Sequence, residues 1–197
     1  MNLDESAVGR LLRMEEVIPA MERALADFSS GTVVQPVRAM LPVAEHQGFL
    51  GLMPAYTGSA LGARLVAFYP HNTDVPTHHA TILLFRPKIG EPLAAMDARL
   101  ITEVRTAAVS AVATDYLARA DASVLAIIGS GAQARSHLEA LRLVREFREV
   151  RVWSPRRAQA FAEEHGVDAA ASAEEAVRGA DVVVTATTSP TPVLFGE

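Results

Sequence analysis

The sequence predicts an α/β protein made of two domains: an N-terminal α+β domain over residues 1–119 and a parallel-sheet domain over residues 120–197. After residue 120, short apolar runs alternate with helical segments, as in strands joined by crossover helices. Before it, two helical segments precede short apolar runs separated by Gly, Pro, Asn and His clusters, which is typical of an antiparallel or mixed sheet. Apolar residues make up 50% of the chain, enough for a sizeable core.

The clearest signal is the start of the second domain. Residues 124–128 are all apolar and predict a strand buried on both faces. Gly129, Gly131 and Ala134 follow at the spacing G-x-G-x-x-A, and residues 132–145 then predict a helix. Gly129 permits a tight turn, Gly131 lets the backbone approach a phosphate, and Ala134 allows close packing of helix on strand. This combination predicts a Rossmann-type dinucleotide site with the pyrophosphate at the helix N-terminus.

The rest of the second half continues the alternation. We expect strands over residues 149–153 and 181–185, and helices over residues 158–166 and 172–179, the latter capped by Ser172. These elements form an incomplete Rossmann sheet. The alternative is an α/β domain whose glycine turn binds no nucleotide.

The end of the second strand favours one cofactor over another. NAD sites usually place Asp or Glu there for the ribose 2′-hydroxyl, whereas NADP sites use Arg for the 2′-phosphate. Here Ser154, Arg156 and Arg157 follow Trp153, with no acid among residues 154–157. A hydroxyl and planar guanidinium groups suit a phosphate, so NADP(H) is favoured and NAD(H) is possible. In the alternative interpretation the two arginines are simply solvated at a helix start.

Composition excludes several classes of function. The net charge of −5 argues against nucleic acid or an anionic membrane as partner, and the absence of cysteine excludes disulfides and thiolate catalysis. No apolar run reaches transmembrane length, and the N-terminus does not resemble a signal peptide. We therefore expect a soluble cytoplasmic protein. His78, His79 and Asp97 fit no zinc spacing, so no metal site is expected.

The first half predicts helices that precede a sheet. Asp4 caps a short helix that ends near Leu12, and residues 15–28 carry a helical apolar stripe. Residues 101–118 predict the helix that joins the two domains. The expected strands cover residues 38–43, 49–54, 63–69, 80–85 and 93–96.

Three arginines stand where packing alone would not place them. Arg38 begins a strand, Arg64 adjoins an apolar run, and Arg105 lies in an alanine-rich helix. Cations from separate segments can converge on a substrate carboxylate or a cofactor phosphate. Alternatively, each is an ordinary arginine with a packed stem and a solvated head.

Over essentially its whole length the chain resembles the ornithine cyclodeaminase/mu-crystallin family. The similarity rests on several motifs, and the last of them is especially like the mu-crystallin branch. They are residues 35–38 (QPVR), 51–56 (GLMPAY), 65–70 (LVAFYP), 76–85 (PTHHATILLF), 102–110 (TEVRTAAVS), 128–134 (IGSGAQA), and 187–188 with 193–197 (TT and VLFGE).

The resemblance implies a homodimer with a substrate-binding and dimerisation domain before the Rossmann domain. It implies hydride transfer between a nicotinamide and the α-carbon of a small amino or imino acid, specifically the NADP(H)-dependent reduction of a cyclic ketimine. By motif position, Arg38 and Arg105 grip the substrate carboxylate and a cofactor phosphate, and with Arg64 they are the catalytic candidates. The implied cofactor-binding residues are Thr77, His78, Arg105, Gly129, Ser130, Gly131, Ala132, Gln133, Ser154, Arg156 and Thr187.

Two departures from the family pattern keep alternatives open. Arg64 stands where the family usually has lysine, and arginine keeps the charge but does not exchange a proton near neutrality. The family also continues for about 100 residues beyond position 197, so we expect a truncated chain. The alternatives are an ornithine cyclodeaminase that uses NAD, which the acid-free strand end disfavours, and a non-catalytic ligand-binding or truncated member.

Overall fold

The computed structural model describes residues 1–196, and its contacts divide the chain into two compact units. The first unit comprises Met1–Arg13 and Glu22–Thr102, and the second comprises Met14–Met21 and the chain from Glu103 onward. The predicted α/β class is confirmed, since one sheet is largely antiparallel and the other is parallel. The assignment of functions to residues 1–119 and 120–197 stays a prediction.

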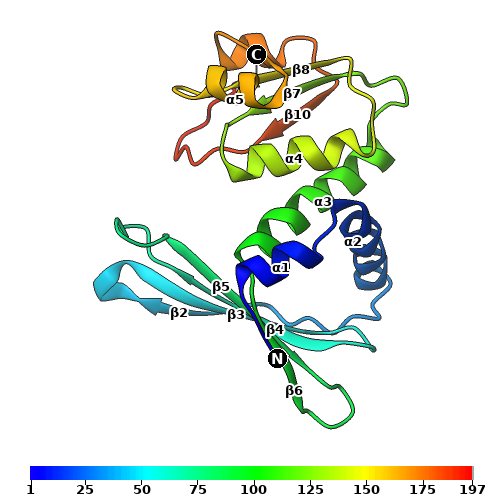
Figure 1. Cartoon of the computed structure of the whole chain (residues 1–197), viewed down its shortest axis with the longest axis vertical. Coiled ribbons are helices and arrows are strands. Elements are labelled where there is room, and N and C mark those ends of the chain that lie inside the picture. Colours follow the sequence, from blue (N-terminus) through cyan, green and yellow to red (C-terminus); the bar gives the residue numbers. More distant parts are fainter. Residues whose placement is uncertain (197) are drawn as a thin grey trace. The chain divides into compact units, whose positions relative to one another are not determined.

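The first unit is built on a six-stranded sheet in the order β1-β6-β5-β4-β3-β2 (Figure 1). All neighbours are antiparallel except β1, which runs parallel to β6. The sequence did not suggest β1, because two residues are too few to show a periodic pattern. The strands are β1 (Asn2–Leu3), β2 (Ala39–Val43), β3 (Gly48–Tyr56), β4 (Leu61–Phe68), β5 (His78–Phe85) and β6 (Pro92–Asp97).

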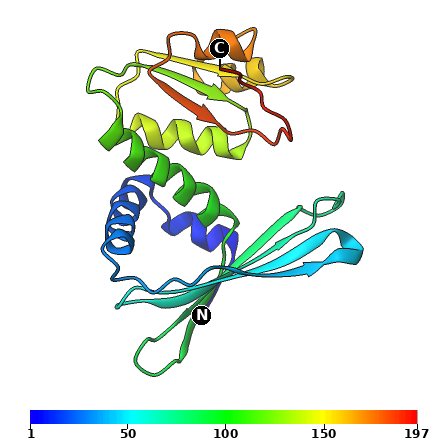
Figure 2. The ribbon, with the colours of Figure 1, turned by 180° about the vertical axis from the view of Figure 1, so that it is seen from behind.

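The two faces of this sheet differ in burial because side chains alternate along each strand. Val66 of β4 and Ala80 of β5 are paired, buried and packed with Met53 and Ile82. The opposite face carries leucines that stay exposed, and Leu52 of β3 is 42% exposed. Figure 2 shows the long strands β3, β4 and β5 that form the centre of the sheet.

The helices of the N-terminal region follow the predicted pattern. α1 (Glu5–Leu11) begins after Asp4, whose carboxylate accepts the backbone N–H of Ala7 at 2.8 Å. α2 (Met14–Ser29) starts in the second unit, where Met14 joins the main core cluster. The short helix η1 (Ala44–His46) connects β2 to β3.

The second unit contains a parallel sheet in the order β10-β7-β8-β9. From the β9 edge the strands are the third, second, first and fourth of this unit along the chain, which is the order 3-2-1-4 of a doubly wound sheet. The helix α3 (Arg99–Leu117) begins in the first unit and belongs to the second from Glu103 onward. The other elements of the second unit are β7 (Val124–Ile128), α4 (Ala132–Arg142), β8 (Glu149–Trp153), α5 (Ala158–His165), β9 (Asp168–Ala169), α6 (Ala173–Val177) and β10 (Val182–Thr185).

The strand β7 is the centre of this unit. All five of its residues are buried, as its unbroken apolar sequence predicts. Leu125 and Ile127 belong to a core cluster with residues of α3, α4 and α5, whereas Ile128 packs against α6. Chain order reverses at β7, because β8 lies on one side of it and β10 on the other. Ligands of doubly wound sheets bind at the strand ends beside such a reversal.

Candidate functional site

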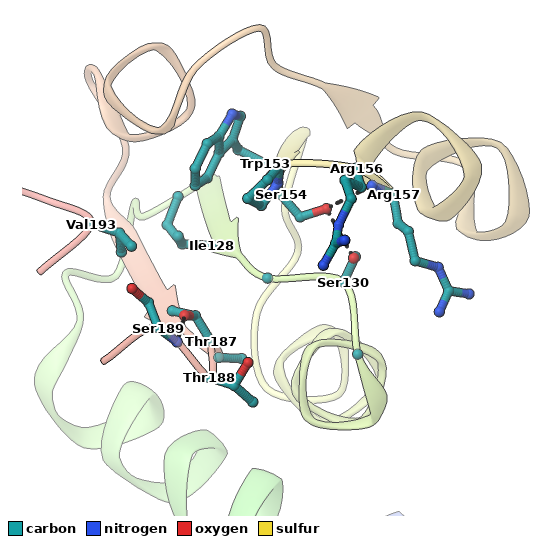
Figure 3. Close-up of a pocket in the computed structure, with 14 residues that line it drawn as sticks. Ile128, Ser130, Trp153, Ser154, Arg156, Arg157, Thr187, Thr188, Ser189 and Val193 are labelled. Atoms are coloured by element: carbon teal, nitrogen blue, oxygen red, sulfur yellow. Dashed lines mark hydrogen bonds between the residues drawn. The ribbon is translucent and has the colours of Figure 1, made fainter. Parts of the chain in front are cut away.

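A cavity of about 410 Å³ lies at the carboxyl ends of β7, β8 and β10 (Figure 3). Residues from all three strand ends line it. Those expected to bind a cofactor are Gly129, Ser130, Gly131, Ser154, Arg156 and Thr187. The structure thus brings together residues that are up to about 60 positions apart in sequence, because parallel strands end at the same edge of a sheet.

The glycine turn has a specific steric cause. Gly129 has a φ of +127°, and a Cβ built on it would lie 2.1 Å from the carbonyl oxygen of Ala186. The turn is also fixed by its backbone, since the Gly129 N–H donates to the carbonyl of Trp153 at 2.8 Å. Position 129 therefore admits only glycine.

Gly131 is needed for a different reason. A Cβ there would meet no atom within 4 Å, so the position is sterically open and faces the cavity. Gly131 is the N-cap of α4 and makes no side-chain capping bond. The first N–H groups of a helix have no partner within the helix, so the turn that holds Ala132 and Gln133 offers donors to an anion.

Ser130 and Ser154 connect the glycine turn to the end of β8. The Ser130 hydroxyl donates to Ser154 Oγ at 2.9 Å, and the Arg157 backbone N–H donates to the same oxygen at 3.2 Å. Figure 3 shows the Arg156 side chain running alongside Ser154 toward Ser130, whereas the Arg157 side chain points away. One hydroxyl and one guanidinium therefore face the same part of the cavity.

Thr187 lies on the opposite wall, just beyond β10. Its side-chain oxygen accepts the backbone N–H of Ser189 at 2.7 Å, which shapes the loop that closes this side of the cavity. Trp153, at the end of β8, contributes an aromatic surface to the cavity and packs, as Val193 does, against a buried cluster that contains Ile128.

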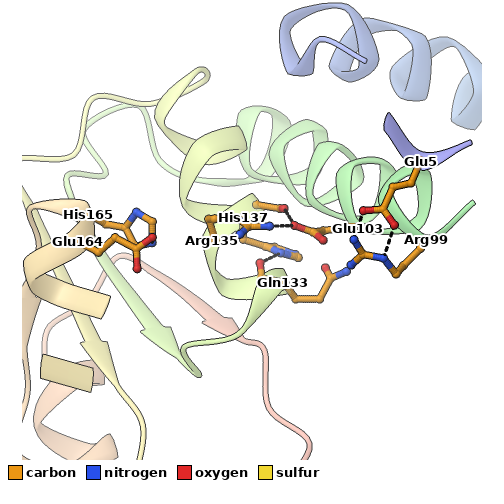
Figure 4. Close-up of polar contacts among 9 residues, drawn as sticks. Glu5, Arg99, Glu103, Gln133, Arg135, His137, Glu164 and His165 are labelled. Atoms are coloured by element: carbon orange, nitrogen blue, oxygen red, sulfur yellow. Dashed lines mark hydrogen bonds and ion pairs between the residues drawn. The ribbon is translucent and has the colours of Figure 1, made fainter. Parts of the chain in front are cut away.

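A polar cluster between α3 and α4 links the two helices near the start of α4 (Figure 4). Glu103 of α3 is only 5% exposed, and its Oε1 accepts hydrogen bonds from Arg135 at 2.6 Å and from Ser136 at 2.7 Å. His137 is 7% exposed; its Nδ1 lies 2.7 Å from the Gln133 carbonyl oxygen, and its Nε2 lies 3.0 Å from Ser110 Oγ.

The chemistry of the partners fixes the role of one ring nitrogen of His137. A carbonyl only accepts, so Nδ1 carries a proton and donates to the Gln133 carbonyl, which leaves Nε2 to share a hydrogen bond with the Ser110 hydroxyl. Sequence reasoning missed this cluster, although one acid in an otherwise alanine-rich helix face is a signal that points to it. Its effect is to link α4, whose N-cap Gly131 lines the cavity, to α3.

The candidate residues of the first unit lie on its sheet and next to it. Arg64 of β4 is half-buried, with its Nη2 donating to Thr102 Oγ1 at 3.0 Å. Burial lowers the pKa of His78 below its ordinary value of 6.5, and the charge of Arg64 and the neighbouring His79 lower it further. Thr77 precedes β5, and its carbonyl accepts the Tyr69 N–H at 2.8 Å.

The other two arginines are placed separately. Arg38 is exposed directly before β2, and Arg105 is exposed on α3 in the second unit. The convergence of Arg38, Arg64 and Arg105 on one anion stays a prediction. Among residues 1–196, no group of three or more His, Cys, Asp or Glu side chains is placed to hold a metal ion, and no helix is long and apolar enough to cross a membrane.

Comparison with known proteins bears on the whole chain. The model of the ornithine cyclodeaminase/mu-crystallin family matches residues 1–197. The ketimine reductase mu-crystallin of Macropus fuliginosus is 48% identical over 194 residues, which cover 92% of this chain and 62% of the relative. The chain thus spans somewhat less than two thirds of the length of this relative.

Two solved structures share the fold over nearly all of the chain. The Thermococcus litoralis Delta(1)-pyrroline-2-carboxylate reductase, solved with NADH and L-proline, is 38% identical with a TM-score of 0.89, and the match covers 98% of this chain and 64% of that one. An archaeal alanine dehydrogenase dimer with bound NAD is 37% identical with a TM-score of 0.92, over 98% of this chain and 62% of that one. The fold, the motifs and the family model agree: the chain belongs to the ornithine cyclodeaminase/mu-crystallin family.

Proposed function

We propose that the cavity at the ends of β7, β8 and β10 binds NADP(H), and that the protein reduces a cyclic ketimine carboxylate by hydride transfer. The observation that carries the cofactor assignment is that Ser154 and Arg156 both line the cavity just beyond the end of β8, where no acid stands. A carboxylate there would accept from a ribose hydroxyl and repel a phosphate, whereas these two groups donate.

Each group of hydrogen-bond donors in the cavity suits a different part of the cofactor. The uncapped first turn of α4 faces an anion, which suits the pyrophosphate. Ser154 and Arg156 lie on the β8 side and suit the 2′-phosphate, while Thr187 on the β10 side suits the nicotinamide ribose. Thr77, His78 and Arg105 complete the predicted set around the nicotinamide half.

The chemistry of the substrate follows from its charge. When bound, the reduced nicotinamide supplies a hydride to the carbon of a protonated C=N bond, whose π electrons pass to nitrogen to give the amine. Arg38, Arg64 and Arg105 hold the neighbouring carboxylate and so orient that carbon. Arg64 acts here through its charge alone, since a guanidinium stays protonated. His78, whose pKa is lowered, is the neutral group of the set near pH 7.

Relatives with imine substrates support this reaction class. Besides the ketimine reductase of Macropus fuliginosus, the Delta(1)-pyrroline-2-carboxylate reductase of Bacillus cereus is 37% identical over 195 residues. Both names describe reduction of a C=N bond, which is part of a ring in the pyrroline carboxylate. The second candidate is ligand binding without turnover, which the replacement of the expected lysine by Arg64 favours.

We also propose that the protein forms a homodimer through the exposed face of the six-stranded sheet. Leu41, Leu50 and Leu52 are 61%, 38% and 42% exposed on neighbouring strands. Contiguous apolar surface of this kind marks an interaction site. The alanine dehydrogenase that shares this fold is a dimer. A cytoplasmic location stays an expectation of the sequence.

The cofactor assignment is tested by titrating the chain with NADPH and NADH and following the emission of Trp153, its only tryptophan. We expect NADPH to bind at least about tenfold more tightly, since a hydrogen bond to a charged group contributes about 1.5–3 kcal/mol. Arg156→Ala removes most of this preference, and the matched variant Arg157→Ala removes less because its side chain points away from Ser154. Equal affinity for both cofactors would contradict the assignment.

The reaction is tested separately. NADPH oxidation with a cyclic ketimine carboxylate supports reduction, whereas binding of both ligands without turnover supports the second candidate. Formation of proline from ornithine without added cofactor would instead indicate a cyclodeaminase.

A further inference from the structure

The hydrogen bonds around Ser154 leave it one way to contact a ligand. A serine hydroxyl has one proton to donate and two lone pairs that accept. Ser154 Oγ already accepts from the Ser130 hydroxyl at 2.9 Å and from the Arg157 backbone N–H at 3.2 Å. Both acceptor positions are filled, so the proton of Ser154 is what remains for a group in the cavity.

This polarity distinguishes the two cofactors. A phosphate has only acceptor oxygens, so a hydroxyl that only donates matches it fully. A ribose 2′-hydroxyl also carries a proton, and that proton finds no acceptor on Ser154 or on Arg156, whose guanidinium has donors alone. An unpaired donor in a cavity costs binding free energy. The bond from Ser130 therefore makes Ser154 less suited to NAD(H) without moving any charge.

We propose that Ser130 is a specificity-determining residue for the 2′-phosphate of the cofactor, acting as a positioning residue through Ser154. This inference rests on the proposed binding of NADP(H) in this cavity. Ser130 belongs to the glycine turn and Ser154 to the end of β8, so their bond couples the pyrophosphate end of the site to the 2′-phosphate end. Figure 3 shows the two side chains facing each other across the cavity wall.

The test uses two probes that differ only at the 2′ position, adenosine 2′,5′-bisphosphate and 5′-AMP. Their dissociation constants are measured by calorimetry on the 197-residue chain and on Ser130→Ala. We expect the preference for the bisphosphate to fall by about 2- to 10-fold, the range of one neutral hydrogen bond. The affinity for 5′-AMP stays equal or rises slightly, because Ser154 regains a lone pair for the ribose hydroxyl.

Two further variants separate this role from a structural one. Ser130→Thr keeps the hydroxyl and is expected to keep the preference. Ser154→Ala lowers the preference at least as far as Ser130→Ala does. The double variant falls no further than Ser154→Ala, because one residue acts through the other.

Other outcomes would overturn the inference. If wild type prefers the bisphosphate and Ser130→Ala keeps that preference in full, the inference fails while the cofactor proposal stands. If Ser130→Ala weakens the binding of both probes equally, Ser130 only maintains the conformation of the glycine turn, and the inference fails as well. If wild type shows no preference for the bisphosphate, both the inference and the NADP(H) assignment fail.

Discussion

The carboxylate of Glu103 and the hydroxyl of Ser136 form a 2.7 Å hydrogen bond inside the second unit, although they are 33 residues apart in sequence. Both side chains are buried, at 5% and 3% exposure. The bond joins α3 to the first turns of α4, the helix whose N-terminus faces the candidate cofactor cavity. Stability of the fold and geometry of the site therefore depend on the same contact.

The first prediction concerns this bond. Glu103→Ala is expected to lower the free energy of unfolding by about 2–4 kcal/mol, because it leaves the Ser136 hydroxyl buried without its partner and removes a buried carboxylate from Arg135. Urea unfolding followed by Trp153 emission measures the change. Glu103→Gln still accepts from Ser136 and is expected to lose less. An equal loss in both variants would show that charge, and not the hydrogen bond, is what matters.

The second prediction uses the two glycines of the turn as a matched pair. Gly129→Ala is expected to destabilise the protein by more than about 3 kcal/mol, because the new Cβ would overlap the Ala186 carbonyl at a φ of +127°. Gly131→Ala meets no atom within 4 Å and is expected to change stability by less than about 1 kcal/mol. Its methyl group faces the cavity, so NADPH affinity should fall instead. A thermal melt and an NADPH titration on each variant distinguish the two effects.

The third prediction concerns pH. The pKa of His78 is lowered in the folded state by burial, then by Arg64 and His79, relative to an ordinary value of 6.5. As pH falls below about 6.5, the unfolded state therefore binds more protons than the folded state. The free energy of unfolding decreases over that range. We expect the free energy of unfolding of wild type to decline between pH 7 and pH 5 more steeply than that of His78→Asn. Parallel pH profiles would contradict the lowered pKa.

The fourth prediction concerns self-association. Leu52→Lys places a charge on the exposed apolar face of the six-stranded sheet and is expected to shift a dimer toward monomer by at least about tenfold in dissociation constant, since burying an unpaired charge costs several kcal/mol. Leu117→Lys is the control, because Leu117 is 84% exposed at the end of α3 and lies off that sheet. Sedimentation velocity over a concentration series measures both. A monomeric wild type would contradict the proposed dimer.

The sequence predicted much of the second unit because its signals are local. The apolar run 124–128, the glycine spacing and the Ser172 cap each specify structure within a few residues, and each was found. The helix expected to reach Arg145 ends at Arg142. It was expected to be longer because Val144 continues the helical spacing of Leu138 and Leu141 beyond the last turn. Apolar runs and the turn residues between them are also local signals, so the five expected strands of the first half appear within about two residues of their predicted bounds.

What the sequence did not predict depends on contacts between distant segments. Glu103 with Ser136 and Ser110 with His137 are pairs of common residue types, and nothing in their spacing links them. The bond from Ser130 to Ser154 is similar, because each serine was predicted to contact the cofactor but not the other. Hydrogen bonds of side chains across elements follow from the fold, and a linear pattern does not encode them.

The central position of β7 has a consequence for hydrogen exchange. Each of its amides lies in a strand flanked by β8 and β10 and sealed from water on both faces. Such amides exchange with solvent only when the whole unit opens, whereas loop amides exchange through small local fluctuations. The backbone of Ile127 thus reports global unfolding, and the backbone of Ser130, three residues later, reports occupancy of the site. One deuterium-labelling experiment therefore reads both the stability of this unit and the binding of its ligand.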